Sequence, residues 1–516
     1  MRADRAFRTD RFGLTAPALA VLALLSHLPA VAEEPAAPPP AGAEELAARR
    51  QRVAEAIGPD AVLLLLPTEP AHRNGDVDWP FRQDDDLYYL TGITQEGTAL
   101  ALVPGEGDHR ELLFARDRDP LHEVWDGRLL DRDELTAASG IEEIAASDRW
   151  RRFLESAFAG WAWGAGDLYR YYRPPGVPHL LAARRAGRAE LWLDLGEREG
   201  RGAPGDPPTP ELRLAEEVRA RWPEVGIRDA APLFERLRAI KSPAEIALLR
   251  RAVEITEEAI RAGMRRTLTA GHEYQVQATI EFTFRDLGAC CWGYPSIVAS
   301  GANATTLHYP FADAPIDRGG LMLFDVGADV RGYTADVTRT FPADGTFSPE
   351  QRAIYEAVLA AWTETLPRFR AGVLPADAHT HALGVIAREL EELGLVAAAE
   401  PEQAELYFLH GLGHPIGLAV HDVFDRARPW APGMVATIEP GIYVRRADVE
   451  ASEVFRGLTE EQQAAIRAAL DRYDGLGVRI EDDVLITDGD PVVLSGGLAR
   501  TVEEIEAFLA AQTAGE

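Results

Sequence analysis

Five possible metal ligands, four carboxylates and one imidazole, each stand in a separate short segment of the second half of the chain. They are Asp325 in FDVGADV, Asp336 in YTADVTRTF, His414 in HGLGHPIGLAVHD, Glu439 in ATIEPGIY and Glu481 in GVRIEDD. The four carboxylates carry four negative charges, which two divalent cations would balance, and the imidazole would distinguish the two ions. An unpaired buried carboxylate costs several kcal/mol or becomes protonated. The segments therefore predict a fold that gathers these residues around two metal ions, as in a hydrolytic centre.

Two of these ligands lie on a predicted β-hairpin. The apolar run Leu321–Phe324 predicts a strand that ends at Asp325, and residues 334–340 predict a second strand with Asp336 and three threonines on one face. A turn centred on Val330-Arg331 places Asp325 opposite Asp336, with Cβ atoms about 5 Å apart. Like charges directly opposite each other destabilise a sheet, so this pairing requires a cation between the two carboxylates.

Three histidines fall within twelve residues around the third ligand. His410 and His414 have the spacing of a helical zinc-protease motif, but no glutamate follows His410, and Gly411 and Gly413 disfavour a helix. We therefore expect a glycine-rich strand or loop that lines a cavity. His421 completes the group, which favours a site over three unrelated histidines.

The last two ligands stand at predicted strand ends. The strand Val435–Ile438 stops before Pro440 and presents Glu439 at its end. Strand alternation puts Arg479 and Glu481 on one face, where the guanidinium is an expected charge-assisted partner. Singly, each would be an ordinary strand-end acid; together with the hairpin they indicate a site.

Bulk composition narrows the classes of function. The 516 residues suggest two to four folded units, and 53 basic against 83 acidic residues give a net charge of −30. Such acidity disfavours nucleic acid and anionic membranes as partners. The two cysteines, Cys290 and Cys291, are adjacent, so they form neither a disulfide framework nor a zinc knuckle. We expect them to be small buried hydrophobes.

The first 32 residues have the pattern of a secretory signal peptide. Basic residues precede an uncharged stretch from residue 12 to residue 32, which ends in Ala30-Val31-Ala32. We expect cleavage after Ala32 and export to the periplasm or the medium, with an uncleaved anchor as the alternative. Residues 33–43 form a Pro-rich spacer.

The remaining chain divides into two predicted domains. Residues 44–235 alternate helical and strand-like segments, with strands expected at 61–66, 88–90, 98–103 and 111–114, and Asp84–Asp86 as a solvated acidic corner. The second domain, residues 236–512, begins with a helix that Ser242 caps, with Pro243 at its first position and Glu245 completing a capping box.

These segments resemble the pita-bread metallopeptidases, most closely the Xaa-Pro aminopeptidase (aminopeptidase P) family. The likeness extends over about residues 44–512 and includes WPFRQDDDLYYLTG (79–92), IKSPAEIALLRRA (240–252) and SIVASGANATTLHY (296–309), which supplies His308. The resemblance implies an α/β (α+β) architecture: a small N-terminal α/β domain followed by a C-terminal pita-bread catalytic domain.

The resemblance also implies how the ligands share two metal ions. Asp325 would chelate one ion, His414 and Glu439 the other, and Asp336 and Glu481 would bridge both. The family suggests manganese, which suits oxygen-rich ligation with a single imidazole.

Further roles follow from the same resemblance. Glu439 would also act as general base, and His308 and His421 would hydrogen-bond the substrate and the oxyanion. His410, Tyr443 and Arg479 would support them around the metals and the substrate. The implied substrates are peptides with proline in second position, and the implied assembly is a homo-oligomer.

Two alternatives remain open. The long interval between Glu439 and Glu481 predicts an extra helix over residues 458–473, with Thr459 and Gln462 as a capping box. Prolidases, which cleave only Xaa-Pro dipeptides, have a helix in a similar place, and a helix over the cleft would shorten the substrate. An inactive binding module on the same fold is the second alternative, although such relatives typically lose several ligands.

Overall fold

The computed structural model describes residues 41–105, 109–160, 177–196 and 207–513. The predicted signal peptide (1–32) and all but the last three residues of the predicted spacer (33–43) lie outside the described residues. Among the residues described, we find no helix of the length and apolarity that crossing a membrane requires.

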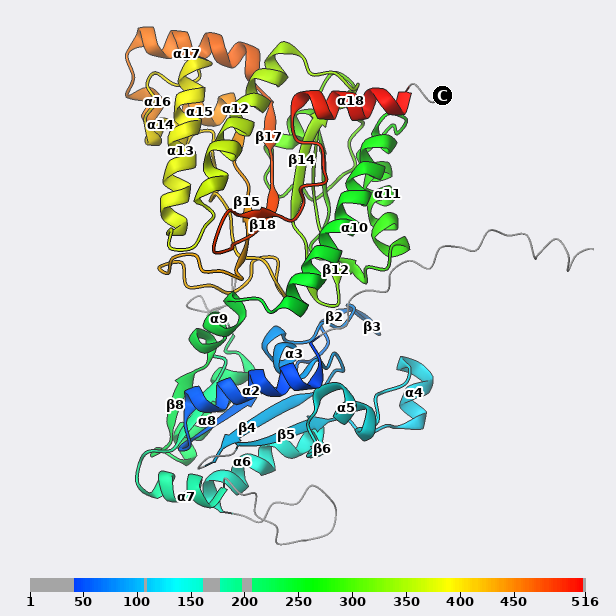
Figure 1. Ribbon diagram of the computed structural model, residues 1–516, viewed down its shortest axis with the longest axis vertical. Coiled ribbons are helices and arrows are strands. Elements are labelled where there is room, and N and C mark those ends of the chain that lie inside the picture. Colours follow the sequence, from blue (N-terminus) through cyan, green and yellow to red (C-terminus); the bar gives the residue numbers. More distant parts are fainter. Residues whose placement is uncertain (1–40, 106–108, 161–176, 197–206, 514–516) are drawn as a thin grey trace, which may run out of the picture. The chain divides into compact units, whose positions relative to one another are not determined.

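The first half of the described chain is built around a six-stranded mixed sheet (Figure 1). Its elements are α2 (Ala43–Ile57), β1 (Ala61–Leu65), β2 (His72–Asn74), β3 (Val77–Asp78), α3 (Asp85–Thr91), β4 (Ala99–Pro104), β5 (His109–Ala115), α4 (Pro120–Asp126), α5 (Arg132–Ser139), β6 (Ile144–Ala146), the 3₁₀ turn η1 (Ser147–Arg149), α6 (Trp150–Ala159), α7 (Val177–Arg185), β7 (Glu190–Leu193), α8 (Pro210–Arg221), β8 (Gly226–Asp229) and α9 (Ala231–Ala239). The strand order is β6-β5-β4-β1-β7-β8, with β4 antiparallel to both of its neighbours.

Strand β1 lies in the centre of this sheet because both of its faces are apolar. Val62 and Leu64 belong to a core that includes side chains of α6, α7 and α8. Leu63 and Leu65 are equally buried, and β1 also contacts α2. A continuous apolar run is typical of a strand covered on both sides, so the strand predicted at 61–66 is confirmed. The strands predicted at 98–103 and 111–114 correspond to β4 and β5.

The strand predicted at residues 88–90 is wrong, because this segment belongs to helix α3. Asp84 caps the helix by accepting hydrogen bonds from the backbone N–H groups of Asp86 and Leu87, and Gly92 ends it with a left-handed conformation. The solvated acidic corner at Asp84–Asp86 is also wrong in part, because Asp86 is buried.

The second half begins with the long helix α10. Its elements are α10 (Pro243–Thr267), α11 (Glu273–Asp286), β9 (Cys291–Trp292), β10 (Ile297–Ser300), η2 (Gly301–Thr305), β11 (Leu321–Val326), β12 (Ala328–Val330), β13 (Tyr333–Thr334), β14 (Val337–Pro342), α12 (Pro349–Thr365), η3 (Leu366–Arg368), α13 (Pro375–Glu392), α14 (Pro401–Ala404), β15 (Val435–Ile438), β16 (Gly441–Tyr443), α15 (Arg446–Ala451), α16 (Glu453–Arg456), α17 (Glu460–Tyr473), β17 (Gly477–Arg479), β18 (Asp482–Leu485), β19 (Val492–Val493) and α18 (Val502–Thr513). The capping box of Ser242 and Glu245 is confirmed. The predicted domain boundary at 235/236 falls inside α9 and stays a prediction.

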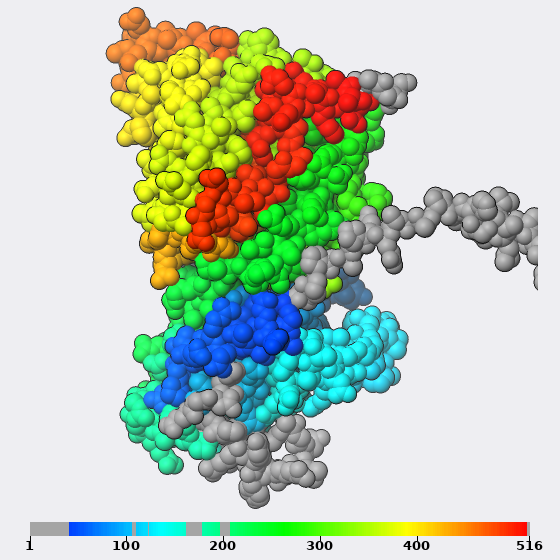
Figure 2. Space-filling view, viewed as in Figure 1, coloured from blue at the N-terminus to red at the C-terminus, as the bar shows by residue number. Residues whose placement is uncertain are grey.

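Two helix pairs flank the strands of the second half. Helix α10 packs against α11, and α12 packs against α13; in Figure 1 the pairs stand on either side of β14 and β17. The last helix, α18, contacts both α10 and α12, and its side chains cover part of the face shown in Figure 2. Among the predicted ligands, Asp325 lies in strand β11, whereas Asp336, Glu439 and Glu481 lie beside strand ends and His414 lies in a segment without helix or strand.

The extra helix predicted over residues 458–473 is α17, and its capping box of Thr459 and Gln462 is confirmed. It packs against α12, and Arg472 lies 3.5 Å from Glu350 at the start of that helix. The side chain of Ala469 lies near Gly394, just after α13. These contacts assign α17 to the helical layer formed by α12 and α13.

The two cysteines are exposed, so the expectation that they are buried hydrophobes is wrong. Cys290 lies in a bend, and Cys291 begins the two-residue strand β9, both of whose residues are exposed.

Candidate metal centre and active site

The hairpin that carries Asp325 and Asp336 has a register shifted by two residues from the predicted one. Asp325 lies opposite Thr338 in the β11–β14 pair, and Val330 lies opposite Tyr333 in the β12–β13 pair. The turn is therefore Arg331-Gly332, where φ is 56° and 86°. Two positive φ values are typical of a type I′ turn, which favours glycine at its second position. The predicted direct opposition of Asp325 and Asp336 is wrong.

The two carboxylates nevertheless converge, on the hydroxyl of Tyr294. This hydroxyl lies 2.6 Å from Asp325 Oδ1 and 2.6 Å from Asp336 Oδ1. Burial, followed by the charges of both carboxylates, raises the pKa of Tyr294 well above its ordinary value. The phenol therefore keeps its proton and holds the two aspartates beside each other.

His414 joins the cluster through its Nε2 atom. Its Nδ1 lies 3.1 Å from the carbonyl oxygen of Pro415, which fixes the Nδ1–H tautomer. Nε2 then lies 3.4 Å from Asp336 Oδ2 and 3.6 Å from Glu439 Oε1. Burial opposes the charged ring, but the hydrogen bond to Asp336 and the charge of Glu439 outweigh it, so the pKa of His414 is raised to about 9.

Glu439 and His414 are positioned by backbone pairing between their segments. The backbone N–H of Thr437 in β15 donates to the carbonyl of His414 at 2.8 Å, and its hydroxyl accepts from the His414 N–H at 3.0 Å. Strand β15 ends at Ile438, as predicted, and Glu439 follows it. Residues 405–434 contain no helix, so the exclusion of a helical zinc-protease motif is confirmed.

Glu481 enters the cluster from the chain between β17 and β18. Its Oε2 accepts a hydrogen bond from the Thr338 hydroxyl at 2.5 Å and lies 3.7 Å from Arg479 Nε. The predicted common face of Arg479 and Glu481 is therefore confirmed. Arg479 also pairs with Asp325 and donates to the Tyr443 hydroxyl at 2.9 Å.

The cluster has the donor chemistry of a site for hard divalent cations. Ligand atoms of Asp336, His414 and Glu481 all lie within 4.8 Å of one another. Burial first, and then the neighbouring carboxylates, raise the pKa of Glu481 well above its ordinary value and that of Glu439 to about 7. Such crowding of buried carboxylates is relieved when cations bind between them. The residues present therefore fit the predicted divalent metals.

The remaining predicted site residues surround this cluster. His410 Nε2 lies 2.9 Å from the Tyr443 hydroxyl, and burial, followed by the nearby guanidinium, lowers the pKa of His410 to about 3. The ring of His421 lies 4.1 Å, centroid to centroid, from that of His414. His421 and His308 are both exposed, and His308 is near enough to act electrostatically on His410. Both exposed histidines thus face the solvent side of the site.

A buried ion cluster begins directly after His421. Asp422 lies 2.5 Å from Arg238 and 3.1 Å from Lys241, and Arg238 also lies 2.7 Å from Asp86 of α3. All four charged side chains are less than 10% exposed. Burial alone would raise the pKa of Asp422, but Arg238 and Lys241 lower it below its ordinary value. The cluster connects α3 and α9 to the segment that carries His421.

Three site residues were missed by the sequence analysis. Tyr294 lies just before the family-like segment 296–309, and nothing else in the sequence indicated a role for it. Thr338 was recognised only as one of the three threonines on the hairpin face. Asp483 accepts the Asp336 N–H at 3.1 Å, while its other oxygen is buried without a hydrogen-bond partner among the described residues. The acidic run after Ile480 was the available signal for Asp483.

Comparison with known proteins identifies the class. The family model described as metallopeptidase family M24 matches residues 247–488, and the model described as the aminopeptidase P N-terminal domain matches residues 46–162. The carboxylate–imidazole cluster and these matches define an M24 metallopeptidase. Its expected architecture is confirmed: an N-terminal α/β domain followed by a pita-bread domain.

Relatives and solved structures narrow the class. The Xaa-Pro aminopeptidase of Haemophilus influenzae is 31% identical over 90% of this chain and 96% of its own length; that of Escherichia coli is 31% identical over 91% and 98%. A structure of a putative aminopeptidase P from Bacillus anthracis has a TM-score of 0.76 at 30% identity, covering 92% of this chain and 99% of that one. Aminopeptidase P from E. coli with the inhibitor Pro-Leu gives 0.75 at 28% identity, covering 92% and 100%. The chain belongs to the aminopeptidase P family.

Proposed function

We propose that this protein is a metal-dependent Xaa-Pro aminopeptidase, which hydrolyses the bond between an N-terminal residue and a following proline. The observation that carries the proposal is the convergence of three buried carboxylates, the half-buried Glu439 and one imidazole from distant segments of the chain. Relatives named Xaa-Pro aminopeptidase, aligned over about nine-tenths of the chain, support the substrate class.

We propose two divalent cations at this cluster, with manganese as the resident metal. The proposed ligands are Asp325 for one ion, His414 and Glu439 for the other, and Asp336 and Glu481 between them. When bound, such ions supply a water molecule of lowered pKa and polarise a carbonyl group. Oxygen-rich ligation with one imidazole favours a hard ion such as manganese over zinc or copper.

The side chains around the cluster supply proton transfer and substrate positioning. Glu439 is the proposed general base, and its carboxylate lies 3.6 Å from His414 Nε2 and 3.5 Å from His410 Nδ1, beside the cluster. His410 remains neutral because its pKa is lowered. Its Nε2 forms a hydrogen bond with the Tyr443 hydroxyl, and that hydroxyl also accepts a hydrogen bond from Arg479. The exposed His308 and His421 are the proposed hydrogen-bonding groups for the peptide and the oxyanion.

The extra helix α17 gives no evidence for a limit on substrate length. This helix packs in the α12–α13 layer. Its contacts therefore do not support the hypothesis that it covers the cleft and shortens the substrate. The comparisons likewise do not favour a dipeptide-restricted prolidase.

Hydrolysis of Arg-Pro-Pro and Gly-Pro with added manganese tests the proposal. We expect cleavage of the tripeptide, and loss of that cleavage in Glu439→Gln, whereas the exposed control Glu453→Gln on α16 keeps it. Cleavage of Gly-Pro alone would indicate prolidase instead. Failure to cleave either peptide, with a protein that binds no manganese, would leave only an inactive binding module.

We also propose that the protein is exported after cleavage behind Ala32, and that the mature protein forms a homo-oligomer without a membrane anchor. The basic start, apolar stretch and Ala-Val-Ala end support the first statement, and the family resemblance supports the second. The N-terminal sequence of the protein from culture medium or periplasm, and its mass in solution, test the two statements separately.

A further inference from the structure

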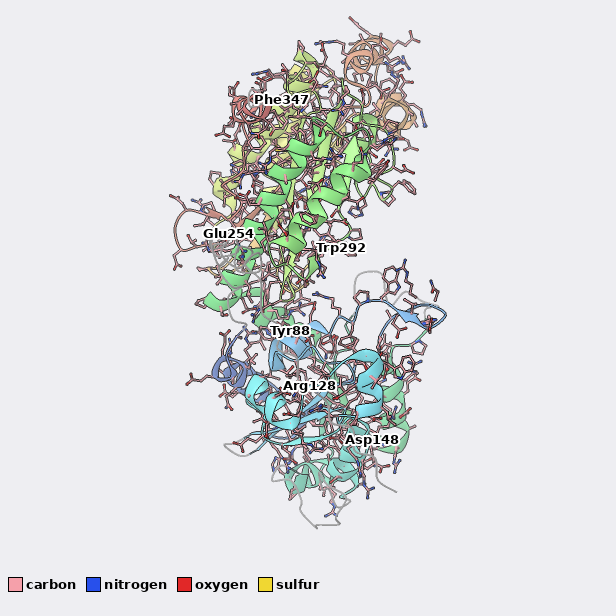
Figure 3. All side chains as sticks on the ribbon, turned by 90° about the vertical axis from the view of Figure 1, so that its right-hand side faces the viewer. Tyr88, Arg128, Asp148, Glu254, Trp292 and Phe347 are labelled. Atoms are coloured by element: carbon pink, nitrogen blue, oxygen red, sulfur yellow. The ribbon has the colours of Figure 1, made fainter. Side chains whose placement is uncertain are left out.

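The two cysteines stand outside the carboxylate cluster and form a compact sulfur pair. Their Sγ atoms are 2.9 Å apart, and both residues are exposed. Cys291 opens strand β9, which lies beside α11; Trp292, the next residue, is labelled in Figure 3. A thiol pair at the surface is open to ligands from solvent, unlike a structural pair in a core.

A buried carboxylate completes the cluster. Asp329 of β12 is paired with Cys291 across the β9–β12 ladder, and the Cys290 N–H donates to the Asp329 carbonyl at 3.0 Å. The Cys290 sulfur lies 3.3 Å from Asp329 Oδ1. One ligand atom from each of the three residues lies within 4.8 Å of the others. Because backbone pairing fixes β9 against β12, the three groups are held together by the fold itself.

The surroundings hold the carboxylate in place and offset its charge. Gly332 donates its N–H to Asp329 Oδ1 at 2.7 Å, and Arg82 lies 3.1 Å from Oδ2. Two thiolates and a carboxylate carry three negative charges, which one divalent cation and Arg82 balance.

We propose that Cys290, Cys291 and Asp329 form a second cation site, specific for a thiophilic divalent ion of the zinc and cadmium class. Thiolates select such soft ions, whereas the oxygen-rich cluster selects hard ones, so the two sites take different metals. The cation exchanges for the two thiol protons, which pass to solvent, and no oxidant or reductant takes part. Water fills the remaining coordination positions because both cysteines are exposed.

Cadmium titration of the full-length, manganese-loaded protein tests this site. Cadmium bound to thiolate gives an ultraviolet charge-transfer band, and the chain has two cysteines, so the band reports this cluster alone. We expect the band to saturate at one cadmium per chain and to be lost after alkylation of the thiols. Cys290→Ser and Cys291→Ser should each abolish it, with peptide hydrolysis retained.

A matched pair of variants tests the carboxylate. Asp329→Asn should weaken cadmium binding, while Asp286→Asn, an exposed aspartate at the end of α11, should leave it unchanged. Circular dichroism checks that the Asp329→Asn protein is folded. If that variant does not fold, the two cysteine variants still test the site. A titration without the band, a band that survives in either serine variant, or a purified protein whose thiols are already joined as a disulfide would overturn the proposal.

Discussion

Replacing Arg238 with methionine should destabilise the protein strongly, because its guanidinium is the centre of the buried ion cluster. The change removes contacts of 2.5 Å to Asp422 and 2.7 Å to Asp86 and leaves both carboxylates in place. Removing one partner from a buried ion pair typically costs about 3–5 kcal/mol, because the other charge stays buried without compensation. Lys241 still pairs with Asp422 at 3.1 Å, so we expect the lower end, about 3 kcal/mol.

Urea unfolding, followed by tryptophan fluorescence, measures this loss against a control on the same helix. Arg236 is exposed, so Arg236→Met should change the free energy of unfolding by no more than about 0.5 kcal/mol. Adding Asp86→Asn to Arg238→Met should change the stability little further at neutral pH, because burial raises the pKa of Asp86 to about 8 and its carboxyl takes up a proton once Arg238 is gone. Equal stabilities of the Arg238→Met and Arg236→Met proteins would refute the argument.

Three further outcomes are expected. Tyr294→Phe removes the hydroxyl between the two aspartates and should weaken manganese binding about 10–100-fold, as measured by equilibrium dialysis; unchanged affinity would contradict its positioning role. Chelation should lower the melting temperature, since a cation present at 100 times its Kd stabilises the folded state by about 2.7 kcal/mol; identical melting with and without manganese would contradict metal binding. Asp422 and Asp482 both have folded pKa values lowered below 3.8, so their stabilising contribution is complete above that pH and is lost as the pH falls through the folded values. Urea titrations between about pH 5 and about pH 2 should show that loss, and a flat profile over this range would contradict it.

The sequence predicted those parts of the structure that depend on local patterns. The capping residues of α10 and α17 and the apolar run of β1 lie as expected, because capping and continuous burial are decided by neighbouring residues. The hairpin was found, but its register was not, because the threonines of β14 repeat every second residue and leave the pairing ambiguous. The glycine at position 332 contained the missing information, since a type I′ turn favours it at the second position.

Most of the wrong or missed predictions concern residues whose structure or burial depends on contacts that local sequence patterns do not reveal. Residues 88–90 have aromatic side chains typical of a strand, yet Asp84 and Gly92 cap a helix around them. Asp86 looked solvated because its partner, Arg238, is distant in the sequence. Tyr294 was missed for the same reason, since its two aspartate partners lie 31 and 42 residues further along the chain.

The separation of the metal ligands along the chain has a consequence for biosynthesis. Asp325 on β11 and Glu481 between β17 and β18 both contact Arg479, and they come together only when these distant segments have folded, so a growing chain has no complete chelating site. We therefore expect metal to be acquired late in folding, in the compartment where folding finishes. The ion that occupies the enzyme is therefore selected by the metal supply at that location as well as by the ligands.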